Sequence, residues 1–311
     1  MSRESFTYLY PTDVKELIST PSEVDNLSLL IDRFAPFQRE EEVLKTSGTV
    51  LMKFFRDPPS VGEETLNEYS RYLREYLLML QEVAKVVKVL RTKSRLVVGL
   101  GDESVYETSI RLLRNYGMPY IPGSALKGIA RYMGIEAIAE ANPERDFYET
   151  VKLIDNALSE GNIEKLSKEL RPAIINGVEI SIDTLARLFG SVESEGCAVF
   201  FDALVSPVAR PRDTLEIKNL IVKNRLDAPF DFDIMNPHYG SYYQEGKAPA
   251  DWDKPIPIVF LTVRKNVPFL FAVGTSKVCD EGAEIAWILL RGALVRNGVG
   301  AKTSLGYGRF E

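Results

Sequence analysis

The chain has 311 residues, of which 45% are hydrophobic and 26% charged, so it has the composition of an ordinary globular protein with a sizeable core. Its net charge of −6 argues against a free-standing, non-specific nucleic-acid binder, which is usually basic, although a local basic groove remains compatible. Cys197, Cys279 and the single histidine, His238, form no zinc-binding pattern. No signal peptide or long apolar run is found, which predicts a soluble, cytoplasmic protein with reduced thiols.

The pattern of apolar residues in the first third of the chain changes near residue 63. Residues 1–60 are short apolar pieces separated by prolines, and we expect an irregular arm or insertion that packs on a domain, with a short helix over Leu27–Phe34. From Glu63 to about Arg91, apolar residues recur at three- and four-residue spacing, which predicts a long amphipathic helix. The opposite face of this helix is basic and either is solvated or meets a partner or nucleic acid. It carries Arg71, Arg74, Lys85, Lys88 and Arg91.

A strand followed by a helix is predicted next. Arg95–Leu100 is aliphatic and β-branched and predicts a strand, with Val105–Leu112 as its continuation or partner. After a Pro-Gly turn, Ser124 is a reasonable N-cap for a helix over Ala125–Ala141. The start of such a helix, with Gly123, Ser124, Lys127 and Arg131, is either an anion site or a tight turn with solubilising cations.

The remaining elements alternate between helices and strands. Residues 143–190 are charged and predict a helical insertion, and Ala283–Val295 predicts a later helix. Phe230–Asp253 is aromatic and turn-rich, and we expect a loop there. The predicted helices of the insertion are Phe147–Leu158, Ile163–Leu170 and Ile182–Phe189, and the predicted strands are Gly196–Val205, Leu215–Val222, and a hairpin of Pro257–Arg264 with Pro268–Gly274.

The C-terminal stretch Gly298–Phe310, G-V-G-A-K-T-S-L-G-Y-G-R-F, is rich in glycine and hydrogen-bond donors. Such glycine density indicates unusual dihedral angles or the close approach of a partner to the main chain. Lysine, arginine and hydroxyl groups suit a polyanion such as a nucleic-acid backbone. The one aromatic ring, a tyrosine, is expected to stack on a base. We expect Tyr307–Phe310 to form a final strand that ties down the chain end.

The order of these elements predicts an α+β fold of the ferredoxin-like kind, with helices on one face of an antiparallel sheet. We expect an N-terminal arm and long helix over residues 1–94 and a main domain over 95–311 with the insertion at about 143–190. Since the first and last elements of such a fold are neighbours, the two Gly-plus-cation segments are expected to converge on one groove.

Known catalytic patterns fit this sequence poorly. A P-loop or a dinucleotide fingerprint requires glycines at other positions around Gly300 and Lys302. His238, in N-P-H-Y, is a candidate general acid or base for RNA cleavage, but a lone histidine is more often structural. The scattered aspartates match no metal-binding loop, which favours solvated or capping roles. They are Asp202, Asp231, Asp233, Asp251 and Asp253.

Two segments together, I-P-G-S-A-L-K-G-I-A-R and the C-terminal glycine-rich stretch, resemble the RAMP superfamily of CRISPR RNA-guided effector proteins. Three further stretches resemble the sixth subunit of the type III-B (Cmr) complex within that superfamily. They are L-F-G-S-V-E-S-E-G-C-A-V-F-F-D-A, D-I-M-N-P-H-Y-G-S-Y-Y and D-W-D-K-P-I-P-I-V-F-L-T-V. The resemblance covers Arg95–Glu311.

This resemblance implies a modified ferredoxin-like (RRM-type) fold with helical insertions and an N-terminal helical extension. It implies a non-catalytic subunit without cofactor or metal, which binds the 3′ part of the guide RNA, caps the backbone filament and contacts the other Cmr subunits in antiviral defence. The implied RNA contacts are Gly123, Ser124, Lys127, Arg131, Gly298, Gly300, Lys302, Thr303, Tyr307 and Arg309.

Two rival functions stay open from the sequence. One is a metal-independent CRISPR endoribonuclease that uses His238, with Tyr239 in the same functional loop. The other is a protein-interaction scaffold in which the glycine-rich stretch only packs.

Overall fold

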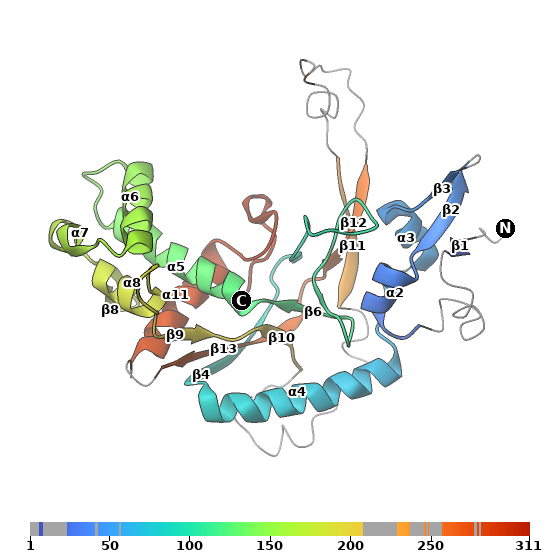
Figure 1. Ribbon diagram of the computed structural model, residues 1–311, viewed down its shortest axis with the longest axis horizontal. Coiled ribbons are helices and arrows are strands. Elements are labelled where there is room, and N and C mark those ends of the chain that lie inside the picture. Colours follow the sequence, from blue (N-terminus) through green and yellow to red (C-terminus); the bar gives the residue numbers. More distant parts are fainter. Residues whose placement is uncertain are drawn as a thin grey trace. The chain divides into compact units, whose positions relative to one another are not determined.

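The computed structural model describes residues 6–8, 24–40, 43–55, 57–207, 229–236, 246, 248, 257–276, 279 and 281–311 (Figure 1). The chain divides into two compact units. Unit 1 comprises Met1–Arg71, Val97–Pro119 and Ile221–Val267, and unit 2 comprises Tyr72–Leu96, Tyr120–Leu220 and Pro268–Glu311. The division therefore differs from the expected boundary after residue 94, because unit 1 combines the N-terminal region with two later segments.

Unit 1 is built from small antiparallel sheets and short helices. Strands β1, β2 and β3 form one sheet, and β11 pairs with β12 from Phe230↔Val263 to Met235↔Ile258. Helix α3 packs closely on β12, where a Cβ at Gly48 would overlap the carbonyl oxygen of Val259. The elements are β1 (Thr7–Tyr8), α2 (Leu27–Arg33), β2 (Pro36–Glu40), β3 (Val43–Lys45), α3 (Gly48–Phe55), the first part of α4 (Glu63–Val83), β5 (Leu112–Leu113), β11 (Phe230–Met235) and β12 (Ile258–Val263).

Unit 2 contains the main antiparallel sheet. Its strands are β4 (Val86–Arg91), β6 (Met118–Ile121, which begins in unit 1), β9 (Ala198–Phe200), β10 (Ala203–Val205) and β13 (Pro268–Thr275). Strand β13 is central: it pairs with β4 on one side and with β9 and β10 on the other, and β10 also pairs with β6. A bridge between Thr92 and Phe310 adds the chain end beside β4.

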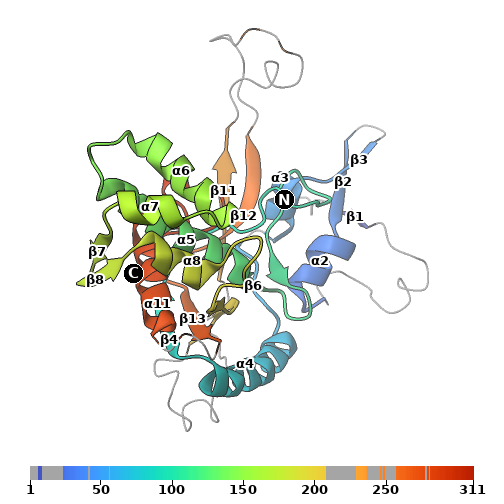
Figure 2. The same cartoon turned by 60° about the vertical axis from the view of Figure 1, so that its left-hand side comes forward.

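Two long helices cover one face of this sheet. Helices α5 (Gly123–Glu140) and α11 (Gly282–Arg296) lie side by side, and the part of α4 in unit 2 lies on the opposite face (Figures 1 and 2). Phe310 packs edge-to-face against Phe269 and Phe271 beneath α11. The chain order β4, α5, β9–β10, β13, α11, Phe310 and the pairing of these strands confirm the expected ferredoxin-like α+β fold.

Several predicted elements are confirmed and others are wrong. Helices α5 and α11 match their predictions, and the predicted strand over Gly196–Val205 is present as β9 and β10, interrupted at Phe201 and Asp202. The helix predicted to reach Arg91 ends at Val83, because the valines that follow are β-branched and pair with β13 as strand β4. Leu215–Val222 lies outside the described residues.

Other corrections concern the loops and pairings. The region 95–112 is buried in part, and Arg111 N–H donates to Val98 O while Ser109 N–H donates to Leu100 O, but the region forms no strand before β5. Residues 230–235, expected in a loop, form β11, whose F-D-F-D-I-M pattern alternates apolar and polar side chains as strands do. The predicted hairpin is also wrong, since β12 pairs with β11 and β13 belongs to the main sheet. Residues 1–60, expected to be irregular apart from a short helix over Leu27–Phe34, contain that helix as α2 and in addition β1, β2, β3 and α3.

The helical insertion is present and contains one feature the sequence analysis missed. Asp146 and Ser181 cap helices α6 and α8 through side-chain acceptors, as expected for residues of their type. A small hairpin with the turn Asn176-Gly177 lies between the helices, and N-G is the usual signal for such a turn. The elements are α6 (Phe147–Glu160), α7 (Glu164–Glu169), β7 (Ala173–Ile175), β8 (Val178–Ile180) and α8 (Ile182–Phe189).

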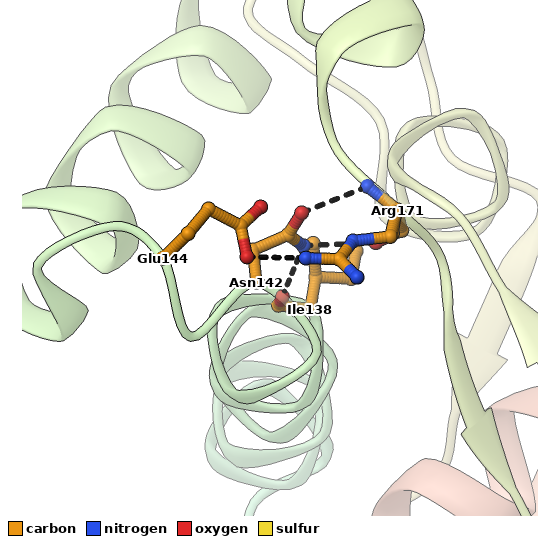
Figure 3. Close-up of polar contacts among 4 residues, drawn as sticks. All are labelled: Ile138, Asn142, Glu144 and Arg171. Atoms are coloured by element: carbon orange, nitrogen blue, oxygen red, sulfur yellow. Dashed lines mark hydrogen bonds and ion pairs between the residues drawn. The ribbon is translucent and has the colours of Figure 1, made fainter.

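The insertion is fixed to the end of α5 by one buried amide (Figure 3). Asn142 is 0% exposed, and its Nδ2 donates to the carbonyl oxygens of Ile138 (2.8 Å) and Arg171 (3.0 Å). Its Oδ1 accepts from the backbone N–H of Arg171 at 2.9 Å. The Arg171 guanidinium also pairs with Glu144, but both side chains are more than half exposed. The buried amide, rather than the ion pair, is expected to hold this junction.

Cys197 and Cys279 form a disulfide between the start of β9 and the segment before α11, so the expectation of reduced thiols is wrong.

None of the helices in the described ranges is long and apolar enough to span a membrane.

We predict that Asn142→Ala lowers the free energy of unfolding by about 1–3 kcal/mol, because the part-buried backbone N–H and C=O of Arg171 lose their hydrogen-bond partner. Chemical denaturation of the full chain measures this. Glu144→Gln, which removes only the exposed ion pair, should change stability by less than about 1 kcal/mol. Equal effects of the two substitutions would contradict the assignment.

Candidate nucleic-acid interface

The glycine loop, residues 298–309, leaves the end of α11 and returns to it. Gly298 N–H donates to the carbonyl oxygen of Ala293, and Phe310 N–H donates to that of Leu294. Inside the loop, Val299 N–H donates to Gly308 O at 3.0 Å. A Cβ at Gly308 would overlap the carbonyl oxygen of Val299, and its φ is +71°. Glycine is therefore required at this position for the two ends of the loop to meet.

The middle of the loop presents backbone donors. Left-handed residues alternate with residues of negative φ: Gly298 (+83°), Gly300 (+89°) and Lys302 (+60°). Such alternation directs successive N–H groups into a concavity that binds anions. In the part of the chain that the structure describes, the N–H groups of Gly300, Ala301, Thr303 and Ser304 have no acceptor. The short 3₁₀ turn η3 (Thr303–Leu305) follows and is exposed or half-buried.

Lys302 occupies a backbone conformation that a lysine rarely adopts. Its φ of +60° and ψ of +28° are left-handed, which costs a residue with a side chain about 1–2 kcal/mol. Asn176 and Asn266 are the other residues with a side chain and positive φ in the described ranges, and asparagine tolerates that region better. Strained backbone of this kind clusters at functional sites, so the conformation of Lys302 marks the loop as a candidate site.

The chain end is held by residues 91–95. Arg91 and Glu311 exchange two backbone hydrogen bonds of 2.9 Å, and Lys93 N–H donates to Arg309 O at 2.8 Å. Gly308 N–H donates to Arg95 O at 2.7 Å. The final strand expected over Tyr307–Phe310 is reduced to the bridge with Thr92, but the chain end is tied down as expected.

The two residues before the glycine loop, Arg296 and Asn297, are bonded to the C-terminal half of α5. Asn297 Nδ2 donates to Glu136 Oε2 at 2.5 Å, and Arg296 pairs with Glu140. The Arg296 hydrogen bond lowers the pKa of Glu140, while the hydrogen bond with Glu140 raises the pKa of the guanidinium. The loop therefore contacts α5 near its end, and not through Ser124 or Lys127.

The beginning of α5 has a different environment from the one expected. The helix begins at Gly123, and Pro122, not Ser124, is the N-cap residue. The Gly123 N–H donates to Asp202 Oδ1 at 2.7 Å, so a protein carboxylate already occupies the predicted anion position. The Tyr76 hydroxyl donates to the carbonyl oxygen of Asp202, and burial together with the Asp202 charge raises the pKa of Tyr76.

The remaining predicted contacts are distributed along α5 and beyond it. Ser124 is exposed and Lys127 half-buried, whereas the Arg131 guanidinium binds Asp155 and Ser159 of α6. His238 and Tyr239 lie outside the described residues. No group of metal-binding side chains is found within the ranges described, and Asp231 and Asp233 accept hydrogen bonds from the N–H groups that follow them.

We predict that Gly308→Ala destabilises the protein by more than about 2 kcal/mol, because it adds both a steric overlap and left-handed strain. Gly306→Ala is the matched control: its φ is +90°, but its added Cβ would meet nothing within 4 Å. Thermal unfolding of both variants measures the difference. If Gly306→Ala were as damaging as Gly308→Ala, the close contact with Val299 would not be the constraint.

The RAMP superfamily matches residues 89–311, a range that begins inside β4, slightly before the expected Arg95. The CRISPR system Cmr subunit Cmr6 of Pyrococcus furiosus is 41% identical over 98% of this chain and 91% of its own length. The Cmr6 subunit of Saccharolobus solfataricus is 23% identical over 77% of this chain and 64% of its own length.

Two solved structures are also similar. The crystal structure of Cmr6 from Pyrococcus furiosus is 45% identical and covers 72% of this chain and 95% of that chain, with a TM-score of 0.49. A cryo-EM structure of the type III-B Cmr-beta complex bound to cognate target RNA matches at 22% identity over 81% of this chain and 66% of that chain, with a TM-score of 0.45. From the superfamily match and the identity to the Pyrococcus relative over nearly the whole chain, the protein belongs to the RAMP superfamily and, within it, to the Cmr6 subunits.

Proposed function

We propose that this protein is a subunit of a CRISPR type III-B effector complex that binds the guide RNA through its glycine loop and has no catalytic activity of its own. Membership of the Cmr6 subunits supports the place in a Cmr complex with other Cmr subunits as partners. Contact with the 3′ part of the guide and a capping position on the backbone filament are part of the proposal and rest on the family resemblance.

The observation that carries RNA binding is the run of free amides around Lys302. Backbone N–H groups bind phosphate without reading the base, which suits a subunit that must accept guides of any sequence. Lys302 adds a positive charge, and the half-buried Arg309 lies in the same loop. Tyr307 is half-buried and is proposed to stack on a base.

The proposed RNA contacts separate into two groups. The loop residues Gly300, Lys302, Thr303, Tyr307 and Arg309 combine backbone donors with cations and are the stronger candidates. Gly298 is buried and its N–H is bonded to Ala293 O, so it would shape the loop. On α5, Ser124 and Lys127 are accessible, while Gly123 and Arg131 already bind Asp202 and Asp155 and would support the RNA surface by fixing the helix.

We predict that Lys302→Gly separates folding from RNA binding. Glycine relieves the left-handed strain but loses entropy on folding, so the free energy of unfolding should change by less than about 1 kcal/mol. Guide-RNA affinity should fall roughly tenfold, because one charge-assisted hydrogen bond contributes about 1.5–3 kcal/mol. Equilibrium binding of a labelled guide RNA to the assembled complex at several salt concentrations measures this.

Asn176→Gly is the control, since Asn176 also has positive φ but lies in the β7–β8 turn. It should leave RNA affinity unchanged. Unchanged affinity in Lys302→Gly would contradict RNA binding by the loop. Incubation of the wild-type chain with repeat RNA in EDTA tests the absence of catalysis: cleavage that is lost in His238→Ala would replace this proposal with the endoribonuclease.

A further inference from the structure

A second basic segment lies against the glycine loop and played no part in the predicted site. We call residues Arg91–Arg95, with the sequence R-T-K-S-R, the strap. Thr92 is 1% exposed, whereas its neighbours Arg91 and Lys93 are exposed. The strap therefore directs Thr92 inward and two cations outward, as an extended segment does.

The strap and the loop are joined by hydrogen bonds at three points. Lys93 N–H donates to Arg309 O at 2.8 Å, Gly308 N–H donates to Arg95 O at 2.7 Å, and Arg309 N–H donates to Ser94 Oγ at 3.0 Å. These bonds place the cations of the strap directly beside the end of the loop. The contacts use backbone atoms and the Ser94 hydroxyl, so the pairing of the strap with the loop does not require the charge of Lys93.

The charge of these two segments contrasts with that of the whole chain. Strap and residues 298–311 together contain the cations Arg91, Lys93, Arg95, Lys302 and Arg309, against the single carboxylate side chain of Glu311. The chain as a whole has a net charge of −6. Lys93 is exposed and makes no ion pair in the part of the chain that the structure describes. An exposed cation without an ion pair, beside a loop that holds further cations, favours a polyanionic partner.

We propose that the strap is a second phosphate-binding segment of the RNA site, in which Lys93 holds a phosphate next to those held by the glycine loop. This inference rests on the proposed function and extends the proposed RNA surface from the glycine loop to the strap that pairs with the chain end. Ser94 is a positioning residue: its hydroxyl fixes the N–H of Arg309 and so keeps loop and strap in register.

The test compares Lys93→Ala with Lys152→Ala, which removes an exposed lysine from α6 in the same unit. Each variant is assembled with the other subunits and a guide RNA that carries photoreactive uridines. We expect crosslinks to both the strap and the loop in the wild type. We expect Lys93→Ala to weaken guide binding several-fold and to reduce the slope of log affinity against log salt by about 0.7, the value for one phosphate contact in single strands. Lys152→Ala should change neither quantity.

The Ser94 variants add a readout of positioning. Ser94→Ala should speed hydrogen exchange at the Arg309 amide and weaken RNA binding, and Ser94→Thr, which retains a hydroxyl, should restore both. Suppose that the loop crosslinks and Lys302→Gly weakens guide binding, but the strap does not crosslink and Lys93→Ala has no effect. This outcome would overturn the inference about the strap and leave the proposed function standing. Absence of crosslinks and of salt effects at both segments would overturn both.

Discussion

The pairing of the chain end with residues 91–95 is the constraint on which the candidate site depends. Arg91 and Glu311 exchange backbone hydrogen bonds, and Phe310 is 0% exposed against Phe269 and Phe271. Full burial of a phenylalanine contributes about 1.5–3 kcal/mol, which is enough to prevent fraying of a terminal segment. Because both ends of the glycine loop are fixed in this way, its middle can hold strained dihedrals and unbonded amides.

The electrostatic arrangement explains how an acidic chain can hold an anionic polymer. Several cations outside the site are engaged with carboxylates, as Arg131 is with Asp155, Arg145 with Glu169 and Arg296 with Glu140. The strap and the glycine loop contain no acidic side chain. Net charge therefore describes the remainder of the surface, whereas the local field at this site is set by these two segments.

Helix α5 is held rigidly by polar contacts at several points. The Asp202 carboxylate caps its start, Arg131 joins it to α6, and Asn142 fixes the segment after its end to Arg171. Glu136 and Glu140 of α5 bind Asn297 and Arg296, which directly precede the glycine loop. The loop is thus built on a helix whose position is determined at both ends, which preorganises its amides for a ligand.

The sequence by itself determined the helices α5 and α11, the helices of the insertion and the special nature of Gly298–Phe310, because periodicity, caps and glycine spacing are local properties. It did not reveal that Val86–Arg91 is a strand, since the helical spacing of apolar residues continued through Val87 and only the pairing with β13 decided otherwise. Nor did it show that Asp202 fills the start of α5, or that Lys93, Ser94 and Arg95 lie beside Gly308 and Arg309. Residues 94 and 309 are more than 200 positions apart, and only the tertiary structure brings their hydrogen-bonding groups together.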